Sequence, residues 1–428
     1  MARRDRQLTF RFLQRIRSRE RRFRAAIASL TLLALLAILV IVPSGREFAV
    51  RAATGSRRAL RSLVGSTPDR GEIEAEAMRK RLRDVAGTRG VFRDIYAETR
   101  PAMRRLLEYS GLSPDVAVIR WGNFDKVLLL PGTVFENDDS GRSYRMRPNT
   151  RSVWLRNVAL PRDLAGFFLV PDEPELRDLV VGTGAAIVAG SEQATNSWGC
   201  RGPEPDLSAP VRGIVLGDST MQGLFVADAQ TPPARLAIEL EKSLGQRVSI
   251  LNTGHLGYSP EQYARTLDEY GDRFKPSFVV LTLCVNDFGD VGDAVRGVGD
   301  WDETRYWIDH IRQWCRTRDV LLVLSPVPYD HQITASRQAG GYPGKPADLI
   351  GSSSLHYVFP IEDLVDEFLR ARSEARRSGR PSPSNPLYNT HIDDHHFSPL
   401  GCEVWGKALA RRLALLLEWR QGEKAKVE

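Results

Sequence analysis

The sequence is poor in cysteine, and the spacing of its cysteines argues against a cysteine-based zinc fold. Four cysteines occur in 428 residues, and no two of them form a C-x-x-C pair. A zinc ribbon requires such pairs, so this class is not expected. Two of the four, Cys284 and Cys315, stand at a predicted strand end and within a predicted helix, where a thiol is readily interpreted as a small buried apolar group.

The chain also lacks a basic character along most of its length, although its net charge is +7. Residues 1–24 hold ten arginines against Asp5 and Glu20, a net charge of +8, so the remaining chain carries −1. No RNA-binding or DNA-binding motif accompanies the basic tail, and a nucleic-acid partner is not expected. The segment that follows explains the tail better.

Charged side chains are absent from residues 25–42. Eighteen residues in a helix rise about 27 Å, close to the hydrocarbon thickness of a bilayer. Because arginines stay on the cytoplasmic side, we predict a single-pass membrane anchor with the chain outside from about Ser44, in the periplasm if the source is Gram-negative. A buried soluble helix would not need the arginines. A cleaved signal peptide is the nearer alternative, but its apolar core is usually shorter and no small-x-small site follows Val42 directly.

This topology would place all four cysteines outside the cell, where a disulfide can persist. Four cysteines permit several pairings, and the sequence does not choose among them. The cysteines concerned are Cys200, Cys284, Cys315 and Cys402.

Residues 43–112 are rich in Arg, Glu, Ala and Leu. Segments 72–85 and 92–109 place apolar residues at helical spacing, which predicts a helical stalk next to the membrane. A partner-binding coiled coil is less favoured because sustained heptads are missing.

Residues 113–195 have a different texture, with short apolar runs separated by Gly, Pro, Asn and Asp. This pattern predicts a small β-rich accessory region. Its aromatic residues Trp121, Tyr144 and Trp154 fit core packing better than a sugar-stacking face.

From residue 213 onward, apolar strand-like runs alternate with amphipathic helical segments. Such alternation predicts a parallel sheet covered by helices on both faces. Residues 326–358 are rich in Pro, Gly and Ser, and are interpreted as a lid or specificity loop or a partly disordered stretch. The expected elements are a strand before Gly217, helix 233–244, strand 247–251, helix 259–273, strand 277–283, helix 303–317, strand 320–324 and a last helix capped by Ser398.

Within this alternation, the apolar run 214–216 ends at Gly217-Asp218-Ser219. A buried strand followed by a tight turn lifts Ser219 to the carboxyl edge of the sheet, where α/β folds keep their reactive groups. A serine hydroxyl needs a base to take its proton and a third group to orient that base. Asp393 and His396, three residues apart, supply such a pair.

Two further blocks follow apolar runs and reach the same edge: NTGHLGYSP at 252–260 and LTLCVNDFG at 281–289. With Gly-Asp-Ser, a Gly in N-x-G-x-x-G, an Asn before Asp and D-x-x-H in this order, the chain resembles the SGNH, or GDSL, hydrolase superfamily. The resemblance covers roughly residues 195–415, including the lead-in NSWGCRGPEP. It implies a three-layer flavodoxin-like α/β domain, which we assign to residues 196–420.

Carried over residue by residue, the resemblance implies that Ser219 is the nucleophile, His396 the general base and Asp393 its orienting group. It also implies an oxyanion hole formed by the amides of Ser219 and Gly257 and the side chain of Asn286. Cys284 stands where the family usually has Gly. Its larger side chain could narrow the pocket or shift Asn286, and so alter the geometry of the oxyanion hole. Asp287 is expected to orient loops by hydrogen bonding, and His255 and Asp218 to be structural.

A metal cluster is a less favoured interpretation of the histidine-rich end, because it leaves the upstream Ser, Gly and Asn blocks unexplained. We therefore expect no metal and no cofactor. The residues that such a cluster would use are His391, Asp393, Asp394, His395 and His396.

The resemblance implies a serine esterase, and the predicted anchor suggests that it removes acetyl or other acyl groups from cell-envelope carbohydrate. A polysaccharide O-acetyltransferase with the same triad and a lipid esterase remain open. A non-catalytic, glycan-binding envelope protein is the alternative of a different class. Oligomeric state is not predicted.

Overall fold

The structure is a computed structural model whose described residues all lie in one compact unit, Ala77–Glu428. The basic tail, the predicted anchor at 25–42 and the predicted stalk up to residue 99 lie outside the described residues. Among the residues that are described, no helix is both long and apolar enough to cross a bilayer. The structure describes residues 100–112, 118–120, 127–129, 131–138, 140, 142–157, 167–284, 287, 301–329, 356–378, 386–389 and 396–427.

A five-stranded sheet forms the centre of the C-terminal part, and all its strand pairs are parallel. The strand order is β10-β9-β11-β12-β13, which is 2-1-3-4-5 in chain order, the flavodoxin-like arrangement. The predicted parallel α/β sheet is therefore confirmed. The strands are β9 (Val211–Leu216), β10 (Val248–Asn252), β11 (Phe278–Leu283), β12 (Leu321–Pro326) and β13 (His356–Val358).

The inner strands are apolar on both faces because helices cover both faces. Every residue of β11 and β12 is buried, so these strands lack the alternation of a half-exposed sheet. β9 lies beside β11, where Gly213 makes room for a neighbouring ring: a Cβ at Gly213 would lie 2.1 Å from Cζ of Phe278. A larger residue at position 213 would force the two strands apart.

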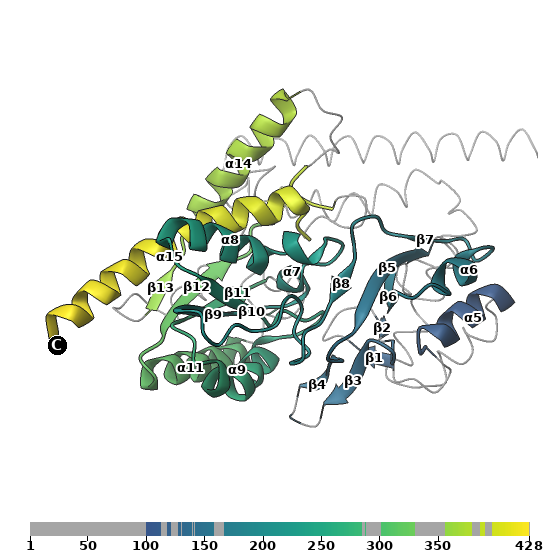
Figure 1. The fold of residues 1–428 in the computed structure, drawn as a ribbon, viewed down its shortest axis with the longest axis horizontal. Helices are drawn as coiled ribbons and strands as arrows, with labels where there is room; N and C mark the ends of the chain where they lie inside the picture. Colours follow the sequence, from purple (N-terminus) through teal and green to yellow (C-terminus); the bar gives the residue numbers. More distant parts are fainter. Residues whose placement is uncertain are drawn as a thin grey trace, which may run out of the picture. The chain divides into compact units, whose positions relative to one another are not determined.

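Helices α9 (Pro260–Phe274) and α11 (Trp301–Thr317) lie on one face of the sheet, and α8 (Pro232–Leu244), α14 (Ile361–Arg377) and α15 (Pro399–Val427) lie on the other (Figure 1). Two separate apolar clusters of buried residues result, one on each face. The predicted helix boundaries hold because the caps are in the sequence. Thr231 accepts a hydrogen bond from the amide of Ala234 at the start of α8, and Gly245 ends it with φ 63°.

A strand of the parallel sheet and one of the helices that cover it were not predicted. Strand β13 lies at the end of the segment interpreted as a loop at 326–358, and helix α14 follows it. A three-residue strand is too short to show a periodicity of two. In α14 the apolar face is narrow, because the buried side chains are only Leu364, Val365 and Phe368 among many charged residues.

The accessory region contains a small antiparallel sheet, in which β5 (Arg151–Asn157) pairs with β6 (Phe167–Pro171), β7 (Ala185–Ile187) and β8 (Gln193–Ala194). Helix α5 (Pro101–Tyr109) buries Met103, Leu106 and Leu107 in the same apolar cluster as β5 and β6. The end of the predicted stalk thus contributes to this core. The remaining elements are β1 (Val118–Arg120), β2 (Val127–Leu129), β3 (Phe135–Asp138), β4 (Ser143–Met146) and α6 (Leu176–Val180).

The structure shows the surroundings of the aromatic residues of the accessory region and of the cysteines. Tyr144 and Trp154 are 4% and 3% exposed, so they pack in the core, while Trp121 lies outside the described residues. All four cysteines are buried free thiols, which excludes a disulfide in this structure. Cys200 and Cys315 belong to the apolar cluster on the α9 and α11 face, and Cys284 and Cys402 to the cluster on the opposite face.

Candidate active site

Ser219 lies just beyond the carboxyl end of the inner strand β9, as predicted. After β9 the chain turns through Gly217 and Asp218 into a short helix, α7 (Ser219–Gln222), whose N-cap is Asp218. A Cβ at Gly217 would lie 2.2 Å from Oγ1 of Thr282, so only glycine permits this tight passage. The β9–β11 neighbourhood is the switch point of a 2-1-3-4-5 sheet, the place where such folds bind ligands.

The structure brings His396 to Ser219 from 177 residues away, with Nε2 of the imidazole 2.8 Å from the hydroxyl Oγ. Both residues are buried, with Ser219 1% and His396 7% exposed. A neutral imidazole accepts a proton at one nitrogen only when the other carries hydrogen. In the tautomer with Nδ1–H, Nε2 accepts the hydrogen bond from Ser219, which is the geometry a general base requires.

The backbone of His396 is fixed by the segment 386–389. The amide of Asn389 donates to the carbonyl of His396 at 2.9 Å, and its side-chain Nδ2 donates to the carbonyl of Phe397 at 2.9 Å. Gly401, in the first turn of α15, permits this segment to approach, because a Cβ there would lie 2.1 Å from the carbonyl oxygen of Leu387. His396 therefore lies just before the packed helix α15, as predicted.

The loop 253–258, which carries Gly257, lies against the nucleophile turn. The amide of His255 donates to the carbonyl of Gly217 at 3.2 Å. A Cβ at Gly254 would lie 2.3 Å from the amide nitrogen of Gln222, so this loop and α7 are in direct backbone contact. Gly257 itself has φ +76°, a conformation that side chains with a Cβ rarely adopt.

Not every predicted site residue falls within the described part of the chain. Asp393 and Asn286 lie outside it, so the orienting carboxylate and the amide donor remain predictions. The histidine-rich metal alternative also stays untested, because His391, Asp394 and His395 lie outside it too. Where side chains are described, no group of three His, Cys, Asp or Glu residues is arranged to hold a metal ion.

Cys284 replaces a glycine of the family pattern and has a definite neighbour in the structure. Its thiol lies 3.3 Å from Oδ1 of Asp218, the residue that caps α7 through the amide of Thr220 at 2.9 Å. Burial raises the pKa of the Cys284 thiol well above its usual value. The thiol therefore remains protonated and donates to Asp218, adding a hydrogen bond that a glycine could not make.

Asp287 makes hydrogen bonds at the end of β11, in keeping with the structural role expected of it. Its carboxyl accepts from the hydroxyl of Tyr263 at 2.8 Å and from the amide of Cys284 at 2.7 Å. Burial, followed by the nearby charge of Asp218, raises the pKa of the Asp287 carboxyl well above its usual value.

One residue of the site region was missed by the sequence analysis, although it lies in the quoted lead-in: Arg201. Its guanidinium is fully buried and pairs with Asp228 at 2.7 Å. It also donates to the carbonyls of Gln222 and Gly223 at the end of α7, at 2.9 and 2.5 Å, and to that of Val226. Arg201 thus anchors the segment that follows Ser219 through one ion pair and several hydrogen bonds.

The chain was compared with protein families, curated proteins and solved structures. No protein-family model and no curated protein matches the sequence. Solved structures similar to the chain include a protein assigned to the lipolytic G-D-S-L family from Desulfitobacterium hafniense DCB-2, at 16% identity and TM-score 0.32, over 47% of this chain and 98% of that one. The acetyl xylan esterase AlAXEase is similar at 18% identity and TM-score 0.34, over 46% and 98% of the two chains. TesA is similar at 16% identity and TM-score 0.34, over 48% and 99%. The chain is thus similar to G-D-S-L-type lipolytic proteins and esterases over about half of its length.

Proposed function

We propose that this protein is a serine-dependent carboxylic ester hydrolase that works through an acyl-enzyme on Ser219. The observation that carries the proposal is the 2.8 Å contact between Ser219 Oγ and His396 Nε2 at the switch point of the parallel sheet. A hydroxyl poised on an imidazole is the minimal apparatus for nucleophilic acyl transfer.

In the first half-reaction, Ser219 Oγ attacks the ester carbonyl while His396 Nε2 takes its proton. The resulting tetrahedral intermediate collapses as His396 returns that proton to the departing alcohol oxygen, which breaks the C–O bond of the ester. In the second half-reaction, water attacks the acyl-enzyme with the same base. The acid product leaves and Ser219 regains its proton.

The negative charge of both tetrahedral intermediates needs fixed donors. Ser219 occupies the first helical position of α7, where the amide makes no intrahelical hydrogen bond. With the Gly257 amide and the Asn286 side chain it would form the oxyanion hole, and each such donor is worth about 3 kcal/mol. Asp393 would hold Nδ1–H of His396.

The test uses the full-length protein in detergent with p-nitrophenyl acetate and a serine-reactive fluorophosphonate. We expect turnover and a single label on Ser219, both lost in Ser219→Ala. The matched control is Ser243→Ala, which removes an exposed serine on α8 whose hydroxyl donates to the Glu239 carbonyl. Wild-type protein that neither turns over nor labels would refute the hydrolase and favour a binding protein that retains the fold.

For the substrate, we propose acetyl or other acyl groups on cell-envelope carbohydrate, with the catalytic part outside the cytoplasmic membrane. Support comes from the arginine tail and the uncharged segment 25–42 in the sequence. Acetate release from acetylated polysaccharide, compared with hydrolysis of long-chain esters, tests the substrate. A preference for long chains would indicate a lipid esterase, and a glycan acceptor that outcompetes water would indicate an acyltransferase. Membrane fractionation and protease accessibility of intact cells test the location.

A further inference from the structure

A hairpin of the accessory region lies on the loop that carries Gly257. Strand β4 of this hairpin exchanges hydrogen bonds with the loop: the hydroxyl of Tyr144 donates to the carbonyl of Leu256 at 2.5 Å, and the hydroxyl of Tyr258 donates to the carbonyl of Tyr144 at 2.6 Å. The amide of Met146 points at Nε2 of His255, 3.3 Å away. The peptide of Gly257 thus lies between two residues, Leu256 and Tyr258, that are both bonded to Tyr144.

The same strand is linked to the nucleophile helix through Gln222. Oε1 of Gln222 accepts from the amide of Leu256 at 2.6 Å, and its Nε2 lies 3.4 Å from the sulfur of Met146. Gln222 is fully buried, and Tyr144 is 4% exposed. Hairpin, loop and α7 are therefore joined by buried hydrogen bonds, so that a shift of one breaks bonds to the others.

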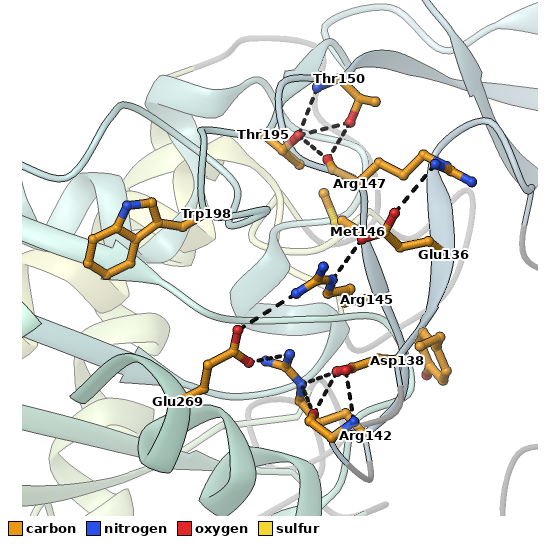
Figure 2. A network of polar contacts seen from close by, with 12 residues as sticks. Glu136, Asp138, Arg142, Arg145, Met146, Arg147, Thr150, Thr195, Trp198 and Glu269 are labelled. Atoms are coloured by element: carbon orange, nitrogen blue, oxygen red, sulfur yellow. Dashed lines mark hydrogen bonds and ion pairs between the residues drawn. The ribbon is translucent and has the colours of Figure 1, made fainter. Parts of the chain in front are cut away.

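Ion pairs fix the hairpin to helix α9, which begins directly after the loop. Arg142, 2% exposed, contacts both Asp138 of β3 and Glu269 of α9, and Arg145 of β4 lies 3.7 Å from Glu269 (Figure 2). Glu269 is thus a second place, besides the Gly257 loop, at which the sheet domain holds the hairpin.

We propose that the β3–β4 hairpin, with Tyr144 as its positioning residue, sets the orientation of the Gly257 peptide as an oxyanion donor. This inference rests on the proposed esterase function. A donor contributes only when it points at the developing oxyanion, and a small displacement loses much of its effect. The β3–β4 hairpin then contributes to catalysis by positioning a donor of the sheet domain.

The first test is Tyr144→Phe, which removes the hydroxyl bond to Leu256 and keeps the ring. We expect kcat to fall about 10-fold, with KM within about twofold, because the donor is displaced but not removed. The Ki of a boronic acid, whose tetrahedral Ser219 adduct carries an oxyanion-like hydroxyl, should rise by the same factor. The control is Tyr109→Phe at the end of α5, which removes a tyrosine hydroxyl bond to Glu173. It should leave kcat and Ki unchanged.

A second test avoids the buried core in case Tyr144→Phe misfolds. Glu269→Gln weakens the anchor of the hairpin from a side chain that is 33% exposed. Its matched control is Asp268→Asn, which alters the neighbouring acid of α9 that pairs instead with His310 of α11 at 3.0 Å. We expect about a threefold loss of kcat for the first change alone, and a smaller additional loss when it is combined with Tyr144→Phe, since both act through one hairpin.

Different outcomes would refute the esterase assignment and the positioning role of the hairpin. If wild-type protein neither turns over nor labels, the esterase assignment is wrong and the hairpin has no oxyanion donor to position. If wild-type protein is active, and Tyr144→Phe and Glu269→Gln, with unchanged melting temperature, keep wild-type kcat and wild-type boronate Ki, the positioning role is refuted while the esterase stands.

Discussion

The two halves of the site are held in different ways. Ser219 and His396 are fixed from within the sheet domain, by the buried Arg201, by Asn389 and by two glycines that permit close packing. The Gly257 loop is held from both sides, by Gln222 of α7 within the sheet domain and by hydrogen bonds from the accessory hairpin. Damage to the first half should abolish the nucleophile or unfold the domain. Damage to the second should leave a reactive serine whose transition state is poorly stabilised.

The largest expected effect is the loss of activity on removal of the general base, His396. His396→Ala removes the proton acceptor of Ser219, so we expect kcat for p-nitrophenyl acetate to fall by about four orders of magnitude, with little change in melting temperature. His310→Ala, which removes an exposed histidine paired with Asp268, serves as the control and should keep full activity. Residual activity above a few per cent in His396→Ala would contradict the assignment of the base.

The next effect concerns the anchor of the nucleophile half. Arg201→Met leaves Asp228 and several carbonyls without their donor, and we expect the free energy of unfolding in urea to drop by about 3 kcal/mol. Arg247→Met removes a guanidinium that is 60% exposed and pairs with Asp206, and should cost less than about 1 kcal/mol. Equal costs for the two changes would show that Arg201 is no anchor.

His255, in the Gly257 loop beside the hairpin, should make the stability of the protein depend on pH. Burial of the His255 ring, reinforced by Arg142 and opposed by the Thr253 carbonyl and Asp138, lowers its pKa from 6.5 to about 4. Between pH 6.5 and 4 the His255 ring is protonated in the unfolded chain but not in the native protein. The free energy of unfolding therefore falls as the pH falls. Above pH 6.5 this group has no effect.

The size of that loss is about 3 kcal/mol over the whole window. His255→Gln has no such proton, so urea unfolding at pH 7 and pH 5 should show a smaller loss of stability for the variant than for wild-type protein. Parallel losses would mean that other groups produce the acid sensitivity.

The smallest expected effect tests the tight passage before Ser219. Gly217→Ala places a methyl group against Thr282 and Met221, and we expect it to cost about 1–3 kcal/mol of stability and to slow fluorophosphonate labelling of Ser219. Gly422→Ala, in α15 with no atom near its added methyl group, should be neutral or slightly stabilising. A neutral Gly217→Ala would show that the turn tolerates a side chain.

Much of the sheet domain was predictable because each signal is local. The apolar runs of β9 and β11, the Thr231 cap and Gly245 lie within a few residues of the features they determine. The pairing of Ser219 with His396 spans 177 residues, and only the four blocks in order indicated it.

The hairpin contact could not be predicted in that way. Tyr144 and Leu256 are 112 residues apart, and a lone tyrosine in a short strand carries no sign of a distant carbonyl partner. The sequence correctly favoured core packing for Tyr144 over a sugar-binding face, but not which loop it would hold. The role of Arg201 could not be predicted for the same reason. The sequence does not distinguish a buried arginine from an exposed one, because the partners that bury it are distant along the chain.

The four buried thiols can report local unfolding, because a thiol becomes reactive when it is exposed to solvent. Two lie in the apolar cluster beneath α9 and α11, and two in the cluster beneath α8 and α15. A maleimide or disulfide reagent can reach a pair only when that layer of helices lifts away from the sheet. Mass spectrometry of modified Cys200 and Cys315, set against Cys284 and Cys402, would therefore time the opening of each layer without any introduced probe.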